Sequence, residues 1–292
     1  MVDNSKSYKI IINTILILMC IACLAPFILL IASSFSSEQA LIAGGYSFLP
    51  KEFTAEAYQY LLQDASVFRA YGVTLVLTTV STTLSVLITT LIAYPLSMST
   101  LPGRGIVSFY VFFTMLFAGG LVPSYMMWTQ VFHIKNTFAA LLFPNLVTNG
   151  FTIMMMRSYF QANIPGEVLE SARMDGASEL YILFKIVIPM SLPIMATVGL
   201  MSGISYWNDW NNNLYYITEP RLNSVQGLLN RMLTNAQYLK QAATMGSVGT
   251  GAVPTTSVRM AVAVLGVVPI LCIYPFFQKY FVKGMTIGAV KG

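Results

Sequence analysis

Glu170-Ser-Ala-Arg-Met-Asp-Gly-Ala-Ser-Glu-Leu-Tyr-Ile-Leu-Phe-Lys-Ile-Val-Ile-Pro-Met-Ser-Leu-Pro193 is a polar, charged stretch between two long apolar runs. Asn163 and Pro165 just before it are suited to begin a helix, because asparagine can cap and proline needs no N–H in the first turn. Gly176 is suited to end that helix, and Ser178 can cap a second one. We therefore predict a short exposed helix, a turn and another helix that contact a second protein.

The first predicted helix has features of a docking element. Ala172 and Gly176 are four positions apart, so we expect them to share a face on which small side chains let another backbone approach closely. Glu167 in the first turn suits the positive end of the helix dipole. The alternative is an ordinary loop between helices whose charges face water.

The composition indicates an integral membrane protein. Of the 292 residues, 56% are hydrophobic and 9% are charged, with a mean hydropathy of +0.68. A soluble domain has roughly 25% charged residues, and a helix needs about 20 apolar residues to cross the bilayer. We predict one all-α membrane domain over 1–292 with six transmembrane helices, at about 10–33, 71–97, 106–129, 137–158, 187–208 and 259–281.

Basic residues near the span ends agree with the orientation that the loop resemblance given below implies. Lys279 and Lys283 follow the sixth span, and positive charge next to a span favours the cytoplasmic side. Both termini and the loop 159–186 are then cytoplasmic, while the loop 209–258 lies outside. The first span has a longer apolar core than a signal peptide, so we interpret it as a retained anchor. Helix-breaking Gly119, Gly120 and Pro123 predict a bend or a re-entrant feature near the outer end of the third span.

Several function classes are excluded by missing residues. The sequence has no Gly-x-x-x-x-Gly-Lys-Ser/Thr loop, so this chain is not expected to hydrolyse ATP. His133 is the only histidine, and Cys20, Cys23 and Cys272 all fall in predicted spans, which predicts neither a catalytic set nor a metal site. Asp209 is the only candidate carboxylate in a span, which argues against a proton-coupled carrier. No basic run suggests nucleic acid. We predict a non-enzymatic chain without a cofactor of its own.

Aromatic, amide and carboxylate side chains gather where the fifth span ends. Facing lipid, these polar groups would be costly, so they are expected to face a watery cavity. Sugar rings stack on aromatic faces and pair with amides, which suits a carbohydrate path. An interfacial aromatic belt that runs into a polar loop is an equal alternative. The candidate substrate-binding residues are Tyr206, Trp207, Asn208, Asp209, Trp210, Asn211 and Asn212.

The second span is rich in hydroxyl groups. These can bond their own helix backbone or allow close helix packing, which we favour over a polar path through the membrane. The residues are Thr78, Thr79, Ser81, Thr82, Thr83, Ser85, Thr89 and Thr90.

The Glu170–Pro193 stretch resembles the EAA loop of ATP-binding-cassette importer permeases. Ser171 and Ile188 depart from the pattern by small changes. The turn that begins at Phe48 and the tail from Tyr274 to Gly292 resemble those of carbohydrate importers, so the resemblance extends well beyond the central loop. The residues that match are Glu170, Ala172, Asp175, Gly176, Ala177, Phe184, Ile186, Pro189 and Pro193.

The resemblance implies a type I importer permease fold in the cell membrane, surrounded by lipid. It implies a second homologous permease, two cytoplasmic ATPase subunits that bind ATP and Mg, and an extracellular solute-binding protein that meets the outer loop. The transported solute would be a carbohydrate, with an oligosaccharide favoured. The implied ATPase-coupling residues are Glu170, Ser171, Ala172, Asp175, Gly176 and Ala177.

Two alternatives stay open at this point. The same loop occurs in permeases for amino acids, peptides and anions, so the solute can differ, and Arg221 or Arg231 in the outer loop could serve a charged sugar. A carrier or channel that works without an ATPase is the other alternative, and the coupling motif argues against it.

Overall fold

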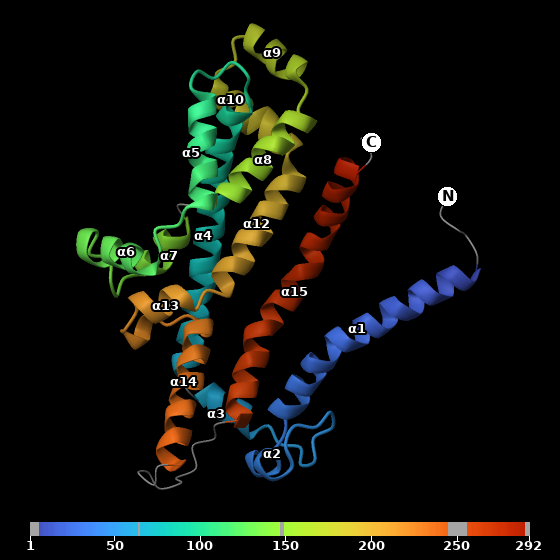
Figure 1. Cartoon of the computed structure of the whole chain (residues 1–292), viewed down its shortest axis with the longest axis vertical. Coiled ribbons are helices and arrows are strands. Elements are labelled where there is room, and N and C mark those ends of the chain that lie inside the picture. The colour runs from blue at the N-terminus through green and yellow to red at the C-terminus, as the bar shows by residue number, and fades with distance from the viewer. Residues whose placement is uncertain (1–5, 64, 147–148, 245–255, 290–292) are drawn as a thin grey trace. The chain divides into compact units, whose positions relative to one another are not determined.

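The computed structural model describes residues 6–63, 65–146, 149–244 and 256–289, which form helices and turns without a strand (Figure 1). Ser36 and Phe53 form an isolated antiparallel bridge in this part of the chain. The predicted all-α class is confirmed for these residues. The helices are α1 (Lys6–Ser34), α2 (Glu38–Gly44), α3 (Glu56–Gln63), α4 (Ala65–Ser97), α5 (Arg104–Leu116), α6 (Leu121–Met126), α7 (Phe138–Leu146), α8 (Gly150–Asn163), α9 (Gly166–Met174), α10 (Glu179–Ile182), α11 (Ile188–Met190), α12 (Leu192–Trp207), α13 (Asn211–Tyr216), α14 (Val225–Thr244) and α15 (Thr256–Ala289), with π-helical turns at Met127–Val131 and Leu183–Val187 and a 3-10 turn at Pro220–Leu222.

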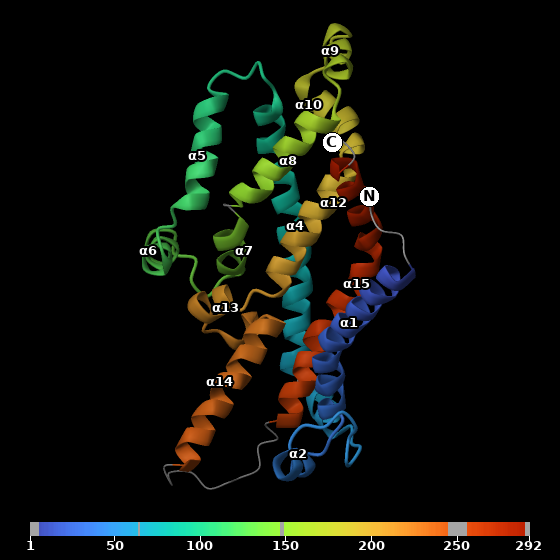
Figure 2. The ribbon, with the colours of Figure 1, turned by 45° about the vertical axis from the view of Figure 1, so that its right-hand side comes forward.

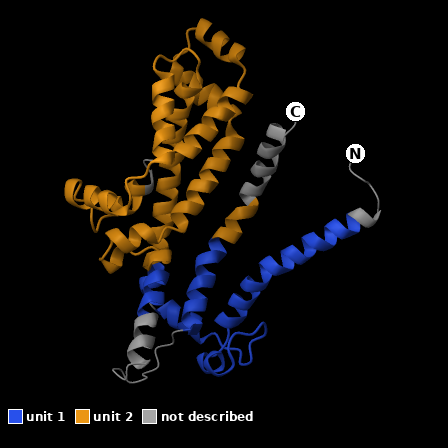
Figure 3. Cartoon of the chain, in the orientation of Figure 1, with its two compact units in different colours: residues 1–68, 228–269 blue, residues 69–227, 270–292 orange. Residues whose placement is uncertain are grey.

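The chain divides into two compact units (Figure 3). Unit 1 comprises Met1–Phe68 and Leu228–Pro269, and unit 2 comprises Arg69–Gly227 and Ile270–Gly292. The long helices α4, α14 and α15 each contribute residues to both units.

Three helices in the described part are long and apolar enough to cross a membrane: Lys9–Ser34, Ala65–Ser97 and Thr256–Pro275. Two bent helix pairs raise the number of candidates to five if each pair is one span. The predicted run 137–158 is divided between α7 and α8, and Asn149 caps α8 by accepting a hydrogen bond from the Thr152 N–H at 3.2 Å. The count of six transmembrane helices therefore stays a prediction.

The bend predicted at Gly119, Gly120 and Pro123 is confirmed. Helix α5 and the segment Leu121–Val131 meet at 112°. Gly120, at the break, has a φ of +85°, a conformation that glycine adopts without the steric cost of a side chain. This residue thus lets the chain turn sharply before α6.

A second bend separates Glu179–Met190 from Leu192–Trp207, at an angle of 84°. Pro189 and Pro193 lie on either side of the break. Proline cannot donate a backbone hydrogen bond and its ring clashes with the preceding turn, so two closely spaced prolines account for the bend.

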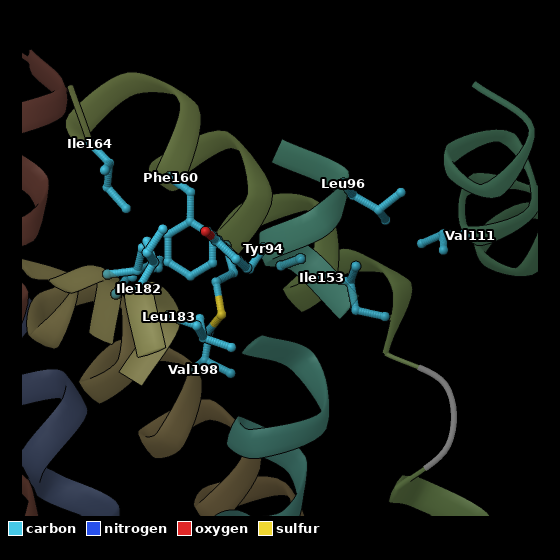
Figure 4. Packing of buried hydrophobic residues seen from close by; sticks show 13 residues of the cluster. Tyr94, Leu96, Val111, Ile153, Phe160, Ile164, Ile182, Leu183 and Val198 are labelled. Atoms are coloured by element: carbon cyan, nitrogen blue, oxygen red, sulfur yellow. The ribbon is translucent and has the colours of Figure 1, made fainter. Parts of the chain in front are cut away.

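The core of unit 2 lies between α4, α8, α10 and α12, near the end of the unit where α9 lies (Figure 2). The ring of Phe160 on α8 points into the space between Tyr94, Ile182 and Leu183 (Figure 4). Burying one such ring stabilises a fold by roughly 1.5 to 3 kcal/mol. These contacts fix the helices from which the α9 loop projects.

Aromatic rings organise unit 1 after α1 ends. Phe35 stacks on Phe53 with ring centroids 5.3 Å apart, and it packs at a tilt against Tyr58 with centroids 4.8 Å apart. The hydroxyl groups of Tyr58 and Ser34 are hydrogen-bonded at 2.8 Å. The loop after α1 is thereby held against α3.

Glu38 in the first turn of α2 caps the first turn of α15. Its carboxylate accepts hydrogen bonds from the Thr256 N–H at 3.0 and 3.1 Å, the Ser257 N–H at 2.8 Å and the Ser257 hydroxyl at 2.9 Å. The first N–H groups of a helix have no partner within the helix, so the carboxylate satisfies donors that would otherwise be unpaired. Burial raises the pKa of Glu38, but these hydrogen bonds outweigh it and hold the pKa below its ordinary value.

We predict that Glu38→Gln lowers the free energy of unfolding by about 1 kcal/mol at pH 7, the usual effect of losing a helix cap. The folded-state pKa of Glu38 is lowered, so its ionised form stabilises the fold above the ordinary glutamate pKa of about 4.3. That contribution is lost as the pH falls through the folded-state pKa. The difference between wild type and variant should therefore narrow towards acid pH in thermal unfolding of the full chain in detergent.

Glu56→Gln is a matched control, because Glu56 also lies in the first turn of a helix in unit 1 and is exposed. It should shift the unfolding midpoint less than Glu38→Gln does. Equal midpoints for wild type and Glu38→Gln at pH 7 would show that the cap contributes nothing.

Candidate functional sites in unit 2

Helix α9 begins directly after Pro165, which has extended backbone angles of −62° and 131°. Glu167 occupies its first turn, as predicted. The cap predicted at Asn163 is wrong: its amide instead donates to the Tyr159 carbonyl at 3.0 Å and so belongs to the end of α8. The cap predicted at Ser178 is confirmed, since its hydroxyl accepts from the Tyr181 N–H at 3.3 Å.

Helix α9 ends in a Schellman motif at Gly176. The Ala177 N–H donates to the Ala172 carbonyl and the Gly176 N–H to the Arg173 carbonyl, each at 3.0 Å. Gly176 has a φ of +80°, which is strained for any residue with a side chain. The prediction that Gly176 ends this helix is confirmed, and the reversal of the chain is tightly defined.

The outward face of α9 is not formed by the small residues Ala172 and Gly176, as was predicted. Ala172 packs against the core of unit 2, and Gly176 lies beyond the last helical turn. The outward residues are Glu170, Ser171, Asp175 and, in particular, Met174, whose side chain is 89% exposed. Met174 was not among the predicted residues, although an apolar residue between Arg173 and Asp175 on a polar helix was the available signal.

Glu179 ties the α9 loop to the end of α4. Its carboxylate accepts from the Arg173 guanidinium, with Nε to Oε1 at 2.7 Å and Nη2 to Oε2 at 3.4 Å. The hydroxyl of Tyr94 donates to Oε2 at 2.8 Å. Tyr94 is buried, so this three-residue cluster, which we call the Tyr94–Glu179–Arg173 tie, joins α9, α10 and α4 through charge-assisted hydrogen bonds.

The candidate substrate-binding residues 206–212, which we call the polar wall, are partly buried inside the unit. The Tyr206 hydroxyl donates to the Leu142 carbonyl at 3.2 Å, and Asp209 Oδ1 accepts from the Asn212 N–H at 3.1 Å. Tyr206, Asp209 and Asn212 are all buried. Asp209 thus orders the first turn of α13, and these three side chains face the interior of the unit.

Asn213 continues this buried packing. It is fully buried, and a Cβ placed on Gly227 would clash with its side-chain amide. Only glycine therefore fits at position 227 without a shift of Asn213. The close approach fixes the start of α14 against α13.

Three of the predicted wall residues lie on the surface instead. Asn208 and Asn211 are exposed, and the Trp210 side chain is 41% exposed. Asn208 Oδ1 accepts from Gln226 Nε2 at 3.3 Å. A solute could reach these three residues, whereas Tyr206, Asp209 and Asn212 already serve the fold.

A cavity of about 250 Å³ lies between α4, α12 and α15 within unit 2. Four threonines of α4 line it together with Gly199, Gly203 and Trp207 of α12. Thr79 and Thr83 donate to carbonyls one turn earlier in α4, each at 2.8 Å. Its walls are therefore mainly the methyl groups and aliphatic atoms of these residues.

Hydroxyl groups of α4 also serve helix packing. Ser85 and Ser202 are hydrogen-bonded at 3.0 Å between α4 and α12, and a Cβ placed on Gly203 would lie 3.3 Å from Thr82 Oγ1. Small residues at this crossing let the two backbones approach closely. These contacts support the packing interpretation of the hydroxyl-rich span.

Comparison with known proteins identifies a family of membrane transport components that matches most of this chain. Residues 66–287 match the family described as binding-protein-dependent transport system inner membrane component. The polygalacturonan/rhamnogalacturonan transport system permease protein YtcP of Bacillus subtilis (strain 168) is 32% identical over 290 residues, which cover 99% of this chain and 100% of that protein. Protein LplC of the same organism is 37% identical over 268 residues, covering 91% of this chain and 89% of LplC.

One solved structure shares the fold over nearly the whole chain. It is a chain of a bacterial ABC transporter involved in the import of the acidic polysaccharide alginate, with a TM-score of 0.82 and 28% sequence identity. The match covers 96% of this chain and 100% of that chain. This chain belongs to the family of binding-protein-dependent transport system inner membrane components, the membrane permeases of ATP-binding-cassette transporters.

Proposed function

We propose that this chain is a permease subunit of an ATP-driven importer for carbohydrate, with an oligosaccharide as the favoured solute. The observation that carries the proposal is the match over almost the full chain to YtcP, which is named for polygalacturonan and rhamnogalacturonan transport. The polar end of α12, where Asn208, Trp210 and Asn211 are exposed, supplies aromatic and amide groups suited to a sugar. An importer of this class needs a second permease, two ATPase subunits that hold ATP and Mg, and an extracellular binding protein.

In this proposal the chain lies in the cell membrane as a single domain with six crossings and both termini in the cytoplasm. Helix α9 then projects on the cytoplasmic side and docks on an ATPase subunit. The site residues proposed for coupling are Glu170, Ser171, Ala172, Asp175, Gly176 and Ala177, to which the structure adds Met174 as the exposed apolar side chain of α9. No bound cofactor is required in this chain.

The tie at Glu179 suggests how motion would reach the membrane. A force on α9 passes through Arg173 and Glu179 to Tyr94 at the end of α4, because charge-assisted hydrogen bonds hold these groups together. Helix α4 also lines the cavity of unit 2. Closure of the ATPase pair would therefore move α4 together with α9 and drive alternating access.

An acidic oligosaccharide is a second candidate solute. It is favoured by the similar structure, which belongs to an importer of the acidic polysaccharide alginate, and by the exposed side chain of Arg221 close to α13. Uptake of neutral and acidic oligosaccharides by the whole transporter distinguishes the two candidates.

Met174→Ala should weaken binding of the ATPase to the assembled permease pair by about tenfold or more. The reason is that a fully buried methionine contributes roughly 1.5 to 3 kcal/mol, while the side chain makes little contact within this chain. The measurement is ATPase retained on the tagged complex in detergent at increasing dilution.

Met19→Ala is the matched control, because Met19 is a methionine of α1 whose side chain is also largely exposed. It should leave ATPase retention unchanged. Equal retention in wild type and Met174→Ala would remove Met174 from the docking face.

Trp210→Ala should change the KM for oligosaccharide uptake while the transporter assembles normally, because Trp210 is exposed and loses only its contact with the solute. Asp209→Ala should instead lower the thermal unfolding midpoint, since it removes the acceptor of the Asn212 N–H inside the unit. Uptake kinetics and unfolding of both variants separate the two roles. An unchanged KM in Trp210→Ala would favour the alternative in which Trp210 belongs to an aromatic belt at the membrane interface and does not contact the solute.

A further inference from the structure

Helices α5 and α8 cross at Gly150. A Cβ placed on Gly150 would lie 2.9 Å from the Val111 carbonyl oxygen and 2.7 Å from Met115 Cγ, so the two backbones nearly touch. Helix α5 begins, and α8 ends, towards the end of unit 2 where α9 lies (Figures 1 and 2). The two helices are therefore antiparallel at this crossing.

This register brings two arginines together. Arg104 precedes Val111 by seven residues, and Arg157 follows Gly150 by seven residues. Seven residues are about two helical turns, or about 10 Å, and return to nearly the same face. Both side chains thus lie at the same level on the facing sides of α5 and α8, towards α9.

Neither guanidinium is neutralised within the described chain. The Nε atoms of Arg104 and Arg157 are buried without a hydrogen-bond partner, and neither arginine forms an ion pair with another described residue. Arg157 Nη1 makes one weak contact, to Met154 Sδ at 3.8 Å. The charge of Arg104 acts unfavourably on that of Arg157, so the pair is suited to an anion that both can contact.

A second, apolar face of α5 lies on the side away from Arg104 and Val111, because Ile106, Phe109 and Phe113 follow Arg104 by two, five and nine residues and so lie roughly 140° to 200° around the helix from it. Ile106, Phe109 and Tyr110 are all strongly exposed. Phe109, Phe113 and Phe117 form a ladder with ring centroids 6.2 and 4.5 Å apart. Because α5 opens a candidate membrane-crossing pair, Arg104 lies where the helix enters the bilayer and this face lies at the depth of lipid chains.

We propose that Arg104 and Arg157 bind the phosphate of an anionic phospholipid at the point where α5 enters the bilayer. Basic pockets between helices at the membrane surface are suited to such headgroups. Arginine presents a planar array of donors that matches phosphate oxygens. This phospholipid belongs to the inner leaflet if α9 lies on the cytoplasmic side, as proposed above, whereas the binding itself does not depend on the orientation.

The test is native mass spectrometry of the full-length chain in neutral detergent, titrated with dioleoyl-phosphatidylglycerol or dioleoyl-phosphatidylcholine. Wild type should bind the anionic lipid about tenfold more tightly than the zwitterionic one, as expected for a charge-assisted contact. Arg104→Gln and Arg157→Gln should each abolish most of this preference, and Arg157→Lys should keep part of it. Arg69→Gln is the matched control, since Arg69 is exposed at the opposite end of α4.

Equal binding of the two lipids by wild type overturns the proposal without any variant having to fold. An unchanged preference in both glutamine variants, or an equal loss in Arg69→Gln, also overturns it. Displacement of the lipid by 10-millimolar inorganic phosphate, at roughly physiological ionic strength, would assign the pair to a free anion instead. The assay measures no transport, so its failure leaves the proposed importer untouched, and loss of the importer proposal leaves the lipid result standing.

Discussion

The hydrogen bonds that meet on the Glu179 carboxylate are the constraint on which the functional end of unit 2 depends. Helix α9 is short, and an isolated helix of this length is marginal in water. It is stable here because its C-terminal turn closes on Gly176 and because Arg173 reaches the same carboxylate as Tyr94. Without that carboxylate, the buried Tyr94 hydroxyl and the Arg173 charge would both lose their partner.

The inward face of α9 holds the helix to unit 2, whereas its outward face is open to another protein. The inward residues Ala172 and Arg173 are occupied by the core and by Glu179, so they are not available to another protein. Met174 and the polar residues around it have few contacts within the chain. The inward face of α9 is held by its contacts with the core and with Glu179, and its outward face is free to contact a partner. The helix is therefore already ordered before docking, which lowers the entropic cost of docking.

The sequence was informative where a residue type has one strong conformational preference. Gly176 and Ser178 were predicted correctly because a helix end favours glycine and a helix start favours a hydroxyl side chain. Gly119, Gly120 and Pro123 predicted the bend for similar reasons. Asn163 was predicted wrongly because an asparagine between two helices can serve either of them, and tertiary packing decides which.

Side-chain direction was the part that the sequence could not supply. Along 206–213, aromatic and amide residues alternate between the interior and the surface, because the chain leaves α12 and starts α13 within a few residues. Composition alone treats Asp209 and Trp210 as neighbours in one wall. The turn between the helices sends Asp209 inward to the Asn212 N–H and leaves Trp210 exposed.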